Sequence, residues 1–286
     1  MTIHGTTQLL GLIGYPVEHS LSPAMHNAAI AQLGVDYVYV PFPVAPDALP
    51  QAVSGLWAIG VQGFNLTIPH KQAVIPFLTN TMPEAKAVGA VNTVYRVKSG
   101  WIGTNTDVLG FMAPLQGRSW DGATAVVLGC GGAARAVVAG CDRLGFQQIQ
   151  IIGRTPEKLQ AFQESWMPLP LNATLSVHLW DELTTCLPHA QLVVNATPLG
   201  MSPKVDASPL DEPALDCLAD GVTVYDLIYV PSPTRLLTDA QNRGAIALDG
   251  LEMLVQQGAA ALELWTQRTA PAEIMRATLK RALGLE

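Results

Sequence analysis

Residues 123–145 read ATAVVLGCGGAARAVVAGCDRLG, and this stretch decides the fold class of the chain. Its first part, Ala123 to Leu128, is short, apolar and rich in valine, which predicts a buried β-strand. The glycine-rich turn Gly129-Cys130-Gly131-Gly132 follows, and Ala133 to Leu144 then has the pattern of a helix. Strand, glycine turn and helix in this order are typical of a dinucleotide-binding unit, although such turns also occur where a helix simply packs close to a strand.

Outward from this stretch, further apolar runs alternate with helical patterns. These runs predict five more strands, at Gln148–Ile152, Leu175–Leu179, Leu192–Asn195, Val222–Leu227 and Ala245–Leu248. Six strands joined by helical crossovers indicate a doubly wound parallel sheet of the Rossmann type. We expect this cofactor domain to span residues 108–249.

The N-terminal part predicts a smaller α/β domain over residues 1–107. Its expected strands are Leu9–Ile13, Tyr37–Phe42 and Gly63–Leu66, followed by a hairpin of Val91–Val97 and Trp101–Ile102. Ser22 before Pro23 is typical of a helix N-cap, and Thr67 is expected to cap a second short helix.

The C-terminal helical patterns, Leu251–Trp265 and Ala272–Leu283, have no strand left to follow. We therefore expect the chain to cross back at Gly250, so that residues 250–286 complete the first domain and the active site lies in the cleft between domains. The other interpretation is that these helices only cover one face of the second sheet.

Composition limits the function classes. The 286 residues are 49% hydrophobic and 14% charged, with a net charge of −7, which disfavours disorder, nucleic-acid binding and anionic membrane surfaces. The sequence has no apolar run of the ~18 residues that a membrane span needs and no basic leader, so we expect a cytoplasmic protein. The four cysteines and six histidines show no metal-ligand spacing, so we expect reduced cysteines and no metal.

The residues after the second strand of the Rossmann unit indicate the cofactor. Arg154 lies 154 − 132 = 22 residues after Gly132, where NAD-binding folds carry an acidic residue that binds the adenosine ribose. A guanidinium there would bind a 2′-phosphate through charge-assisted hydrogen bonds, and Lys158 lies one turn further on. This favours NADP; the alternative is that Arg154 is a solvated loop residue.

Four polar segments of the first domain follow its predicted strands, where the sites of α/β proteins assemble. Among them are one lysine, Lys71, and one carboxylate that could orient it, Asp107. Reduction of a carbonyl needs a group that stabilises and protonates the developing alkoxide, and an ammonium does both. Each residue taken singly could instead have only a structural role.

At this point the chain closely resembles the shikimate dehydrogenase family over nearly its whole length. The motifs that carry the resemblance are Ser20-Leu21-Ser22-Pro23 with His26-Asn27, Asn65-Leu66-Thr67-Ile68-Pro69-His70-Lys71, Gly89-Ala90-Val91-Asn92-Thr93, Asn105-Thr106-Asp107-Val108-Leu109-Gly110, Gly129-Cys130-Gly131-Gly132-Ala133, Gly153-Arg154-Thr155, Asn195-Ala196-Thr197-Pro198, Tyr225-Asp226-Leu227-Ile228-Tyr229 and Asp249-Gly250-Leu251.

The resemblance implies reversible, NADP-linked reduction of 3-dehydroshikimate to shikimate in aromatic amino-acid biosynthesis, with Lys71 and Asp107 as the catalytic pair. It implies that Ser20 and Ser22 bind the substrate carboxylate and that Thr67, Asn92, Tyr229 and Gln257 surround the ring hydroxyls. The cofactor residues that it implies are Gly129, Gly131, Gly132, Ala133, Arg154, Thr155, Lys158, Leu227 and Gly250. We assign His26 and His70 structural roles.

Two positions depart from the family pattern. Gly153 stands where asparagine is frequent, and Glu252 where glycine is common. We keep two alternatives: a quinate/shikimate dehydrogenase of broader specificity, and a non-catalytic metabolite or NADP sensor on the same fold. The expected partners are small molecules, not nucleic acid or membrane, and the expected assembly is a monomer or homodimer.

Overall fold

The computed structural model describes residues 2–167 and 171–285, which form two compact units. The first unit comprises the chain up to Gly110 together with the chain from Leu254 on, and the second comprises Phe111–Met253. Both boundaries fall inside helices, α5 (Asp107–Met112) and α11 (Leu251–Thr266). The boundaries suggested by the sequence, at 107 and 249, lie close to the first residues of these helices.

The first unit contains a six-stranded mixed sheet in the order β2-β1-β3-β5-β6-β4. Strand β1 is parallel to β2 and β3, whereas β5 is antiparallel to both β3 and β6, which confirms the predicted hairpin. The strands are β1 (Gln8–Gly14), β2 (Tyr37–Pro43), β3 (Gly63–Leu66), β4 (Asn80–Thr81), β5 (Thr93–Val97) and β6 (Gly100–Thr104).

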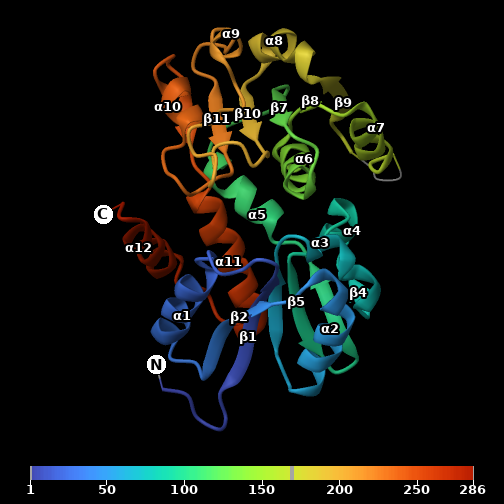
Figure 1. The fold of residues 1–286 in the computed structure, drawn as a ribbon, viewed down its shortest axis with the longest axis vertical. Coiled ribbons are helices and arrows are strands. Elements are labelled where there is room, and N and C mark those ends of the chain that lie inside the picture. Colours follow the sequence, from blue (N-terminus) through green and yellow to red (C-terminus); the bar gives the residue numbers. More distant parts are fainter. Residues whose placement is uncertain (1, 168–170, 286) are drawn as a thin grey trace. The chain divides into compact units, whose positions relative to one another are not determined.

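Helices cover both faces of this sheet, because successive side chains of a strand point to opposite sides. Phe64 and Leu66 of β3 pack in a core with α2 (Leu49–Ala58) and α4 (Pro83–Val88). On the other face, α1 (Ser22–Leu33) packs beside α12 (Ala272–Leu283), as Figure 1 shows. Helix α11 also packs on this second face, through Trp265 against Gly63.

Two predicted helix caps are wrong. Ser22 is the first residue of α1, Leu21 is the N-cap, and no side chain caps the helix. Likewise α3 (His70–Ala73) begins after the N-cap Pro69, and Thr67 lies before it. Helix α1 thus begins one residue earlier than the hydroxyl pattern suggested, and α3 begins two residues later, so the Ser22 and Thr67 side chains are not used as caps.

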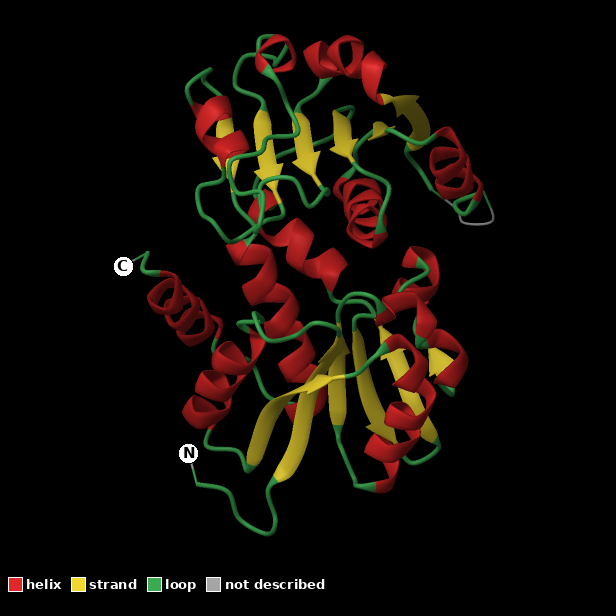
Figure 2. Ribbon diagram, in the orientation of Figure 1, coloured by secondary structure: helices red, strands yellow, loops and turns green. Residues whose placement is uncertain are grey.

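The second unit contains a parallel sheet in the order β12-β11-β10-β7-β8-β9, which confirms the doubly wound Rossmann prediction. Helices alternate with its strands along the chain (Figure 2). The strands are β7 (Thr124–Leu128), β8 (Gln148–Gly153), β9 (Thr174–Leu179), β10 (Leu192–Asn195), β11 (Thr223–Asp226) and β12 (Ile246–Leu248). The helices are α6 (Gly132–Leu144), α7 (Pro156–Glu164), α8 (Leu183–Cys186), α9 (Glu212–Leu215) and α10 (Arg235–Gln241).

The core of this second sheet is apolar on both faces. Val126 and Leu128 of β7 pack in a cluster that includes residues of α8, α9 and α10. The alternate residues Ala125 and Val127 are also fully buried, so the opposite face is covered as well. Across the described residues, no helix is both long and apolar enough to span a bilayer.

Candidate active site

The polar segments of the first unit meet at one edge of its sheet. Parallel strands β1 and β3 end there, at Gly14 and Leu66, and the segments with Ser20, Thr67 and Lys71 follow them. Because β5 is antiparallel to β3, with Asn65 opposite Thr93, its first residue lies at the same edge. Strand β6 ends there too, since Thr104 pairs with Thr93.

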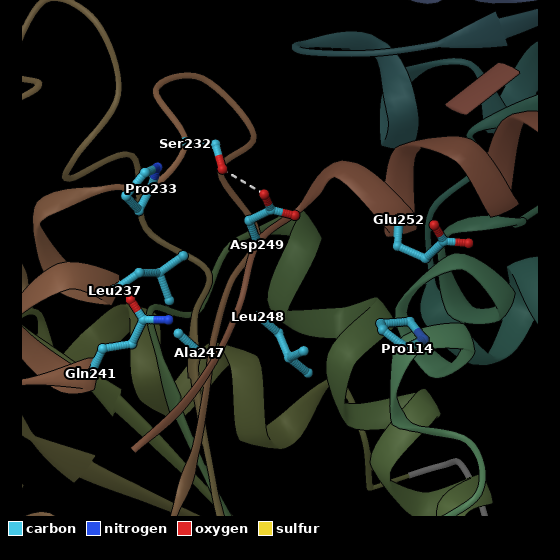
Figure 3. Close-up of a pocket in the computed structure, with 9 residues that line it drawn as sticks. All are labelled: Pro114, Ser232, Pro233, Leu237, Gln241, Ala247, Leu248, Asp249 and Glu252. Atoms are coloured by element: carbon cyan, nitrogen blue, oxygen red, sulfur yellow. Dashed lines mark hydrogen bonds between the residues drawn. The ribbon is translucent and has the colours of Figure 1, made fainter. Parts of the chain in front are cut away.

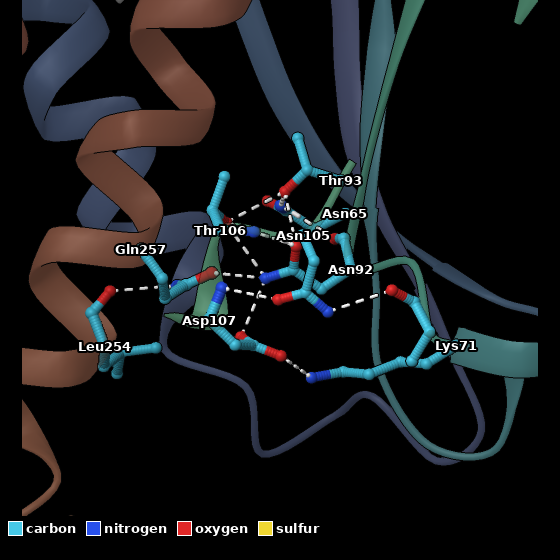
Figure 4. A network of polar contacts seen from close by, with 10 residues as sticks. Asn65, Lys71, Asn92, Thr93, Asn105, Thr106, Asp107, Leu254 and Gln257 are labelled. Atoms are coloured by element: carbon cyan, nitrogen blue, oxygen red, sulfur yellow. Dashed lines mark hydrogen bonds and ion pairs between the residues drawn. The ribbon is translucent and has the colours of Figure 1, made fainter. Parts of the chain in front are cut away.

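Lys71 and Asp107 form a direct ion pair, with 2.5 Å between Lys71 Nζ and Asp107 Oδ2. The Lys71 side chain is 27% exposed and that of Asp107 only 10%. Lys71 extends from the one-turn helix α3 and Asp107 is the first residue of α5, so two segments 36 residues apart supply the pair. The lysine thus keeps an accessible ammonium beside a largely buried carboxylate (Figure 4).

Asn92 holds the second oxygen of that carboxylate. The backbone N–H of Thr106 donates to Asn92 Oδ1 at 2.7 Å, which fixes which end of the amide is the acceptor. The amide nitrogen of Asn92 therefore faces Asp107 Oδ1, to which it donates at 2.7 Å. It also lies 3.0 Å from Thr106 Oγ1. Both oxygens of Asp107 are thereby hydrogen-bonded, which fixes the direction from which Lys71 approaches.

A second layer of buried polar groups supports Asn92. Asn65 donates to the carbonyl of Asn92 at 3.1 Å and to Thr93 Oγ1 at 3.0 Å. The hydroxyl of Tyr39 donates in turn to Asn65 Oδ1 at 2.7 Å. Asn105 accepts from the backbone N–H of Asp107 at 3.0 Å. Every one of these side chains is buried, so the network is both rigid and costly to disrupt.

Gln257 of α11 reaches the same network from the other end of the chain. Asn92 Nδ2 lies 3.4 Å from Gln257 Oε1, while Gln257 Nε2 donates to the carbonyl of Leu254 in its own helix at 2.9 Å (Figure 4). The structure therefore brings together four of the residues that the sequence suggested, namely Lys71, Asn92, Asp107 and Gln257.

The remaining substrate residues suggested by the sequence lie in two places. Ser20, Ser22 and Thr67 belong to the first unit, and Ser20 Oγ accepts from the backbone N–H of Ser22 at 3.3 Å. Tyr229 instead belongs to the second unit, where burial raises the pKa of its hydroxyl. The assignment of Tyr229 to the substrate stays a prediction.

His26 lies in the core of the first unit rather than at its polar edge. Its ring stacks on Tyr39 at 4.3 Å between centroids and lies 5.6 Å from Trp265. Neither ring nitrogen has a hydrogen-bond partner, and full burial lowers the pKa of His26 to about 3. The imidazole is therefore neutral, in keeping with the structural role that we assigned to it.

The glycine-rich turn of the second unit leaves room for a ligand. Gly129 has a φ of +102°, a backbone conformation that favours glycine. Gly131, the N-cap of α6, and Gly132 have ordinary φ values, yet nothing lies within 4 Å of the position that a Cβ would take on either. No protein contact thus demands glycine at these two positions, and the uncapped N-terminus of this 13-residue helix offers N–H groups to an anion.

The other expected cofactor residues follow the carboxyl ends of strands in the same sheet. Arg154, Thr155 and Lys158 are exposed after β8, whose Ile152 pairs with Leu128 of β7. Within the described residues Arg154 makes no hydrogen bond or ion pair, so its charge is available to a ligand. Two cationic side chains beside a glycine turn fit a phosphorylated dinucleotide.

The two departures from the family pattern have a structural setting. A Cβ on Gly153 would lie 2.7 Å from Leu159 Cδ2, so glycine lets α7 pack closely on the end of β8.

Glu252 lines a cavity of about 440 Å³ in the second unit together with Asp249, which accepts from Ser232 Oγ at 2.5 Å (Figure 3). Beside it, Gly250 donates its N–H to the carbonyl of Ile228, so the Leu227 and Gly250 segments adjoin.

Asp226 ties together the loops that follow β10 and β11. It accepts from Asn195 Nδ2 at 3.0 Å, from the backbone N–H of Ile228 at 3.1 Å and from Thr234 Oγ1 at 2.7 Å. The carboxyl group is fully buried with no cation among these partners, and burial raises its pKa to about 6.

Sequence reasoning missed the supporting layer of the site. Asn65, Thr93 and Thr106 lie within the motifs quoted above but received no role, and Tyr39 and Trp265 lie outside those motifs altogether. Successive side chains of β3 point to opposite faces of the sheet, so Asn65 lies on the other face from the apolar Phe64. This alternation could have indicated that Asn65 belongs to the site.

The matching family models and the curated relatives name one family. Sequence models of the "Shikimate dehydrogenase substrate binding domain" and the "Shikimate 5'-dehydrogenase C-terminal domain" match residues 12–94 and 250–280. The chain is 58% identical over 287 aligned residues to "Shikimate dehydrogenase (NADP(+))" of Trichormus variabilis, with 99% of each chain covered.

Solved structures with the same fold include shikimate 5-dehydrogenase of Listeria monocytogenes in complex with shikimate and NAD. Its TM-score is 0.90 at 34% identity, and 98% of each chain is covered. The enzyme of Thermus thermophilus in complex with NADP(H) and shikimate gives a TM-score of 0.85 at 34% identity, with 97% of this chain and 100% of that chain covered.

Proposed function

The chain belongs to the shikimate dehydrogenase family, and from this premise we propose how its own residues carry out the family's reaction. It is an NADP-dependent oxidoreductase that interconverts 3-dehydroshikimate and shikimate, a step of aromatic amino-acid biosynthesis. The observation that carries the proposal is the Lys71 to Asp107 ion pair of 2.5 Å at the polar edge of the first sheet.

Lys71 moves the proton of the reaction. In the direction of reduction, bound NADPH supplies a hydride to the carbonyl carbon of 3-dehydroshikimate. As the C=O double bond becomes single, Lys71 Nζ stabilises the negative charge on oxygen and gives it a proton, so the product is an alcohol. In the oxidative direction the neutral amine of Lys71 takes the hydroxyl proton. Asp107, held by Asn92, orients Lys71 in both directions.

The substrate is held by hydroxyl and amide groups at the same edge. Ser20 and Ser22 bind the carboxylate at the start of α1, where the helix N-terminus also favours an anion. Because neither Ser22 nor any other side chain caps α1, the Ser22 hydroxyl stays available to the substrate. Thr67, Asn92 and Gln257 of the first unit bind the ring hydroxyls, and Tyr229 is a further residue that the family resemblance implies for the substrate.

The glycine turn and the loop after β8 hold NADP. The backbone of Gly129, Gly131, Gly132 and Ala133 receives the pyrophosphate at the N-terminus of α6, where the open space beside two glycines supports close approach. Arg154, Thr155 and Lys158 bind the 2′-phosphate. Leu227 and Gly250, on adjoining segments, contact the rest of the cofactor.

An absorbance assay tests the function. The purified protein should form NADPH from shikimate and NADP, and omission of either compound should abolish the signal. Binding of both compounds without turnover would contradict catalysis and favour a sensor. Parallel assays with quinate, each with NADP and with NAD, test whether the enzyme is instead a quinate/shikimate dehydrogenase of broader specificity. We expect the highest kcat/KM with shikimate and NADP.

We propose that the enzyme works in the cytoplasm as a monomer or homodimer, with small molecules and neither nucleic acid nor membrane as partners. Four free cysteines suit a reducing compartment, and the net charge of −7 opposes binding to polyanions. Light scattering at several protein concentrations measures the assembly state.

A further inference from the structure

Helix α11 is hydrogen-bonded at two points to residues 92–94, at and just before the start of strand β5. The indole N–H of Trp265 donates to the backbone carbonyl of Val94 at 2.9 Å. Two residues earlier on the same segment, the side chain of Asn92 lies 3.4 Å from Gln257 Oε1. Gln257 and Trp265 are eight residues apart, about 12 Å along a helix. The two contacts therefore close a loop that runs through α11 and the start of β5.

The Trp265 contact sets how closely α11 approaches the sheet. A Cβ on Gly63 would lie 2.1 Å from Trp265 Nε1, so the indole lies directly on the backbone of β3 with no side chain between. Trp265 is 7% exposed, and its ring also lies 6.0 Å from that of Tyr39. A rigid, bonded ring at this position leaves α11 little freedom to move along or away from the sheet.

A second close approach lies on the same stripe of the helix. Gly258 and Trp265 are seven residues apart, so they share one face of α11. A Cβ on Gly258 would lie 2.4 Å from Met25 Cε and 3.3 Å from His26 Nε2. Gly258 directly follows Gln257. The distance between α11 and Met25 of α1 at this point therefore decides how far the Gln257 amide reaches toward Asn92.

We propose that Trp265 is a positioning residue that places Gln257 for substrate binding. The proposal rests on the proposed function, because it assigns to Gln257 a contact with a hydroxyl of the shikimate ring. Trp265 does not itself touch the substrate. Its indole hydrogen bond fixes the register of α11 against β5. The Gln257 amide and the Asn92 amide are thereby held close enough together to hydrogen-bond to the same hydroxyl of the ring.

A second route from Trp265 to the site runs through Tyr39. The Tyr39 hydroxyl donates to Asn65, which supports Asn92. If Trp265 acted by this route, its removal would disturb Asn92 and the catalytic carboxylate rather than Gln257. The two routes predict different kinetics, since Asp107 governs the chemical step and Gln257 only the binding of the ring.

The first experiment compares Trp265→Phe with a matched control, Trp101→Phe. Trp101 is also buried in the first unit, and its indole N–H donates to the Val53 carbonyl at 3.3 Å, against the core that contains α2. We expect Trp265→Phe to raise KM for shikimate about fivefold, with kcat and KM for NADP within about twofold of the parent. Trp101→Phe should lower the unfolding temperature without raising KM for shikimate.

The second experiment is a double-mutant cycle with Gln257→Ala. If Trp265 acts through Gln257, Trp265→Phe should raise KM for shikimate no further in the Gln257→Ala background. Independent, multiplicative effects would overturn the proposal, as would a normal KM in Trp265→Phe or a loss confined to kcat. Should Trp265→Phe fail to fold, Gly258→Ala enters the same cycle, because alanine favours the helix while its Cβ crowds Met25; an unchanged KM there also overturns the proposal.

Failure of the underlying function is recognised separately. If the parent protein binds shikimate but forms no NADPH, the proposed function is wrong. The cycle is then measured on shikimate dissociation constants by calorimetry, where coupling between Trp265 and Gln257 has the same expected form. If the parent does not bind shikimate at all, both proposals fail together.

Discussion

Lys71 is the side chain on which the proposed mechanism depends most directly. Lys71→Ala should lower kcat by roughly 10²-fold or more, because the developing alkoxide loses its proton donor, while NADP still binds to the second unit. Steady-state kinetics and an NADP titration measure the two effects. Lys98→Ala, at an exposed lysine in the hairpin turn of the same unit, is the control and should keep the parental kcat. A Lys71→Ala variant with near-normal kcat would remove Lys71 from the mechanism.

His26 should make the first unit sensitive to acid. Its pKa is about 6.5 in the unfolded chain and about 3 in the folded protein, because burial disfavours the imidazolium. The unfolded state therefore binds an extra proton between these values. The contribution of His26 to the free energy of unfolding should be largest above about pH 6.5 and should fall by about 1.4 kcal/mol per pH unit between that pH and about pH 3.

The variant His26→Leu isolates this contribution. Denaturant unfolding at several pH values should show a smaller decline below pH 6.5 than in the parent, whereas His19→Leu, at an exposed histidine, should keep the parental slope. Asp226 acts in the opposite direction, because a carboxyl pKa raised to about 6 makes the folded state bind the extra proton. The difference between variant and parent, rather than the raw slope, is therefore the test. Equal slopes in parent and His26→Leu would exclude the histidine.

At the scale of elements, we propose that the loop between β8 and α7 determines the preference for NADP over NAD. Arg154→Asp should raise KM for NADP more than about tenfold and narrow the preference for NADP over NAD, because the 2′-phosphate would meet a like charge. Assays with both cofactors measure this preference. The control is Arg268→Asp, at an exposed arginine between α11 and α12, which makes the same change in net charge. This variant should keep the parental preference for NADP over NAD. If Arg154→Asp keeps the parental preference for NADP over NAD, residues other than Arg154 must bind the 2′-phosphate.

Most elements of both sheets could be predicted because they carry strong local signals. Strands such as β3 and β10 are short apolar runs whose ends coincide with the prediction, and α12 has the expected helical spacing. Helix α2 was missed because its sequence, LPQAVSGLWA, contains a proline and a glycine that weaken the helical pattern. Strand β4 has only two residues and exists through its pairing with β6, which no local pattern reveals.

The residues of the candidate site also fall into a group that the sequence could predict and a group that it could not. Lys71 and Asp107 are the lysine and the carboxylate of the polar segments, so residue type alone suggested them. Their supporting layer depends on tertiary contacts, since Asn65 meets Asn92 across paired strands and Trp265 meets Val94 over 171 residues of chain. Hydrogen bonds of such long sequence separation leave no periodicity for a sequence pattern to reveal.

At the scale of the molecule, the first unit needs both ends of the chain. A chain that ends at Gly250 loses α11 and α12, and with them the cover of α1, His26 and Tyr39. It should bind a hydrophobic dye and lose shikimate affinity, while the second unit still binds NADP. Dye fluorescence, calorimetric unfolding and separate titrations measure these effects.

A chain that ends at Gly284, the C-cap of α12, is the control and should behave as the full-length protein does. Normal shikimate binding by the shorter chain would show that the C-terminal helices are dispensable. Loss of NADP binding as well would show that the second unit depends on the first for its stability.

The discontinuous first unit also has a consequence for the order in which a ribosome delivers the structure. Domains usually fold from the N-terminus as the chain emerges, at about 5–20 residues per second. Here residues 111–253 are complete, and can fold, while the earlier residues still lack the segment from Leu254 on. The unit synthesised first is therefore finished last. All six strands of its sheet are made early, but the face that α11 and α12 cover stays exposed to chaperones and proteases throughout translation of the middle of the chain.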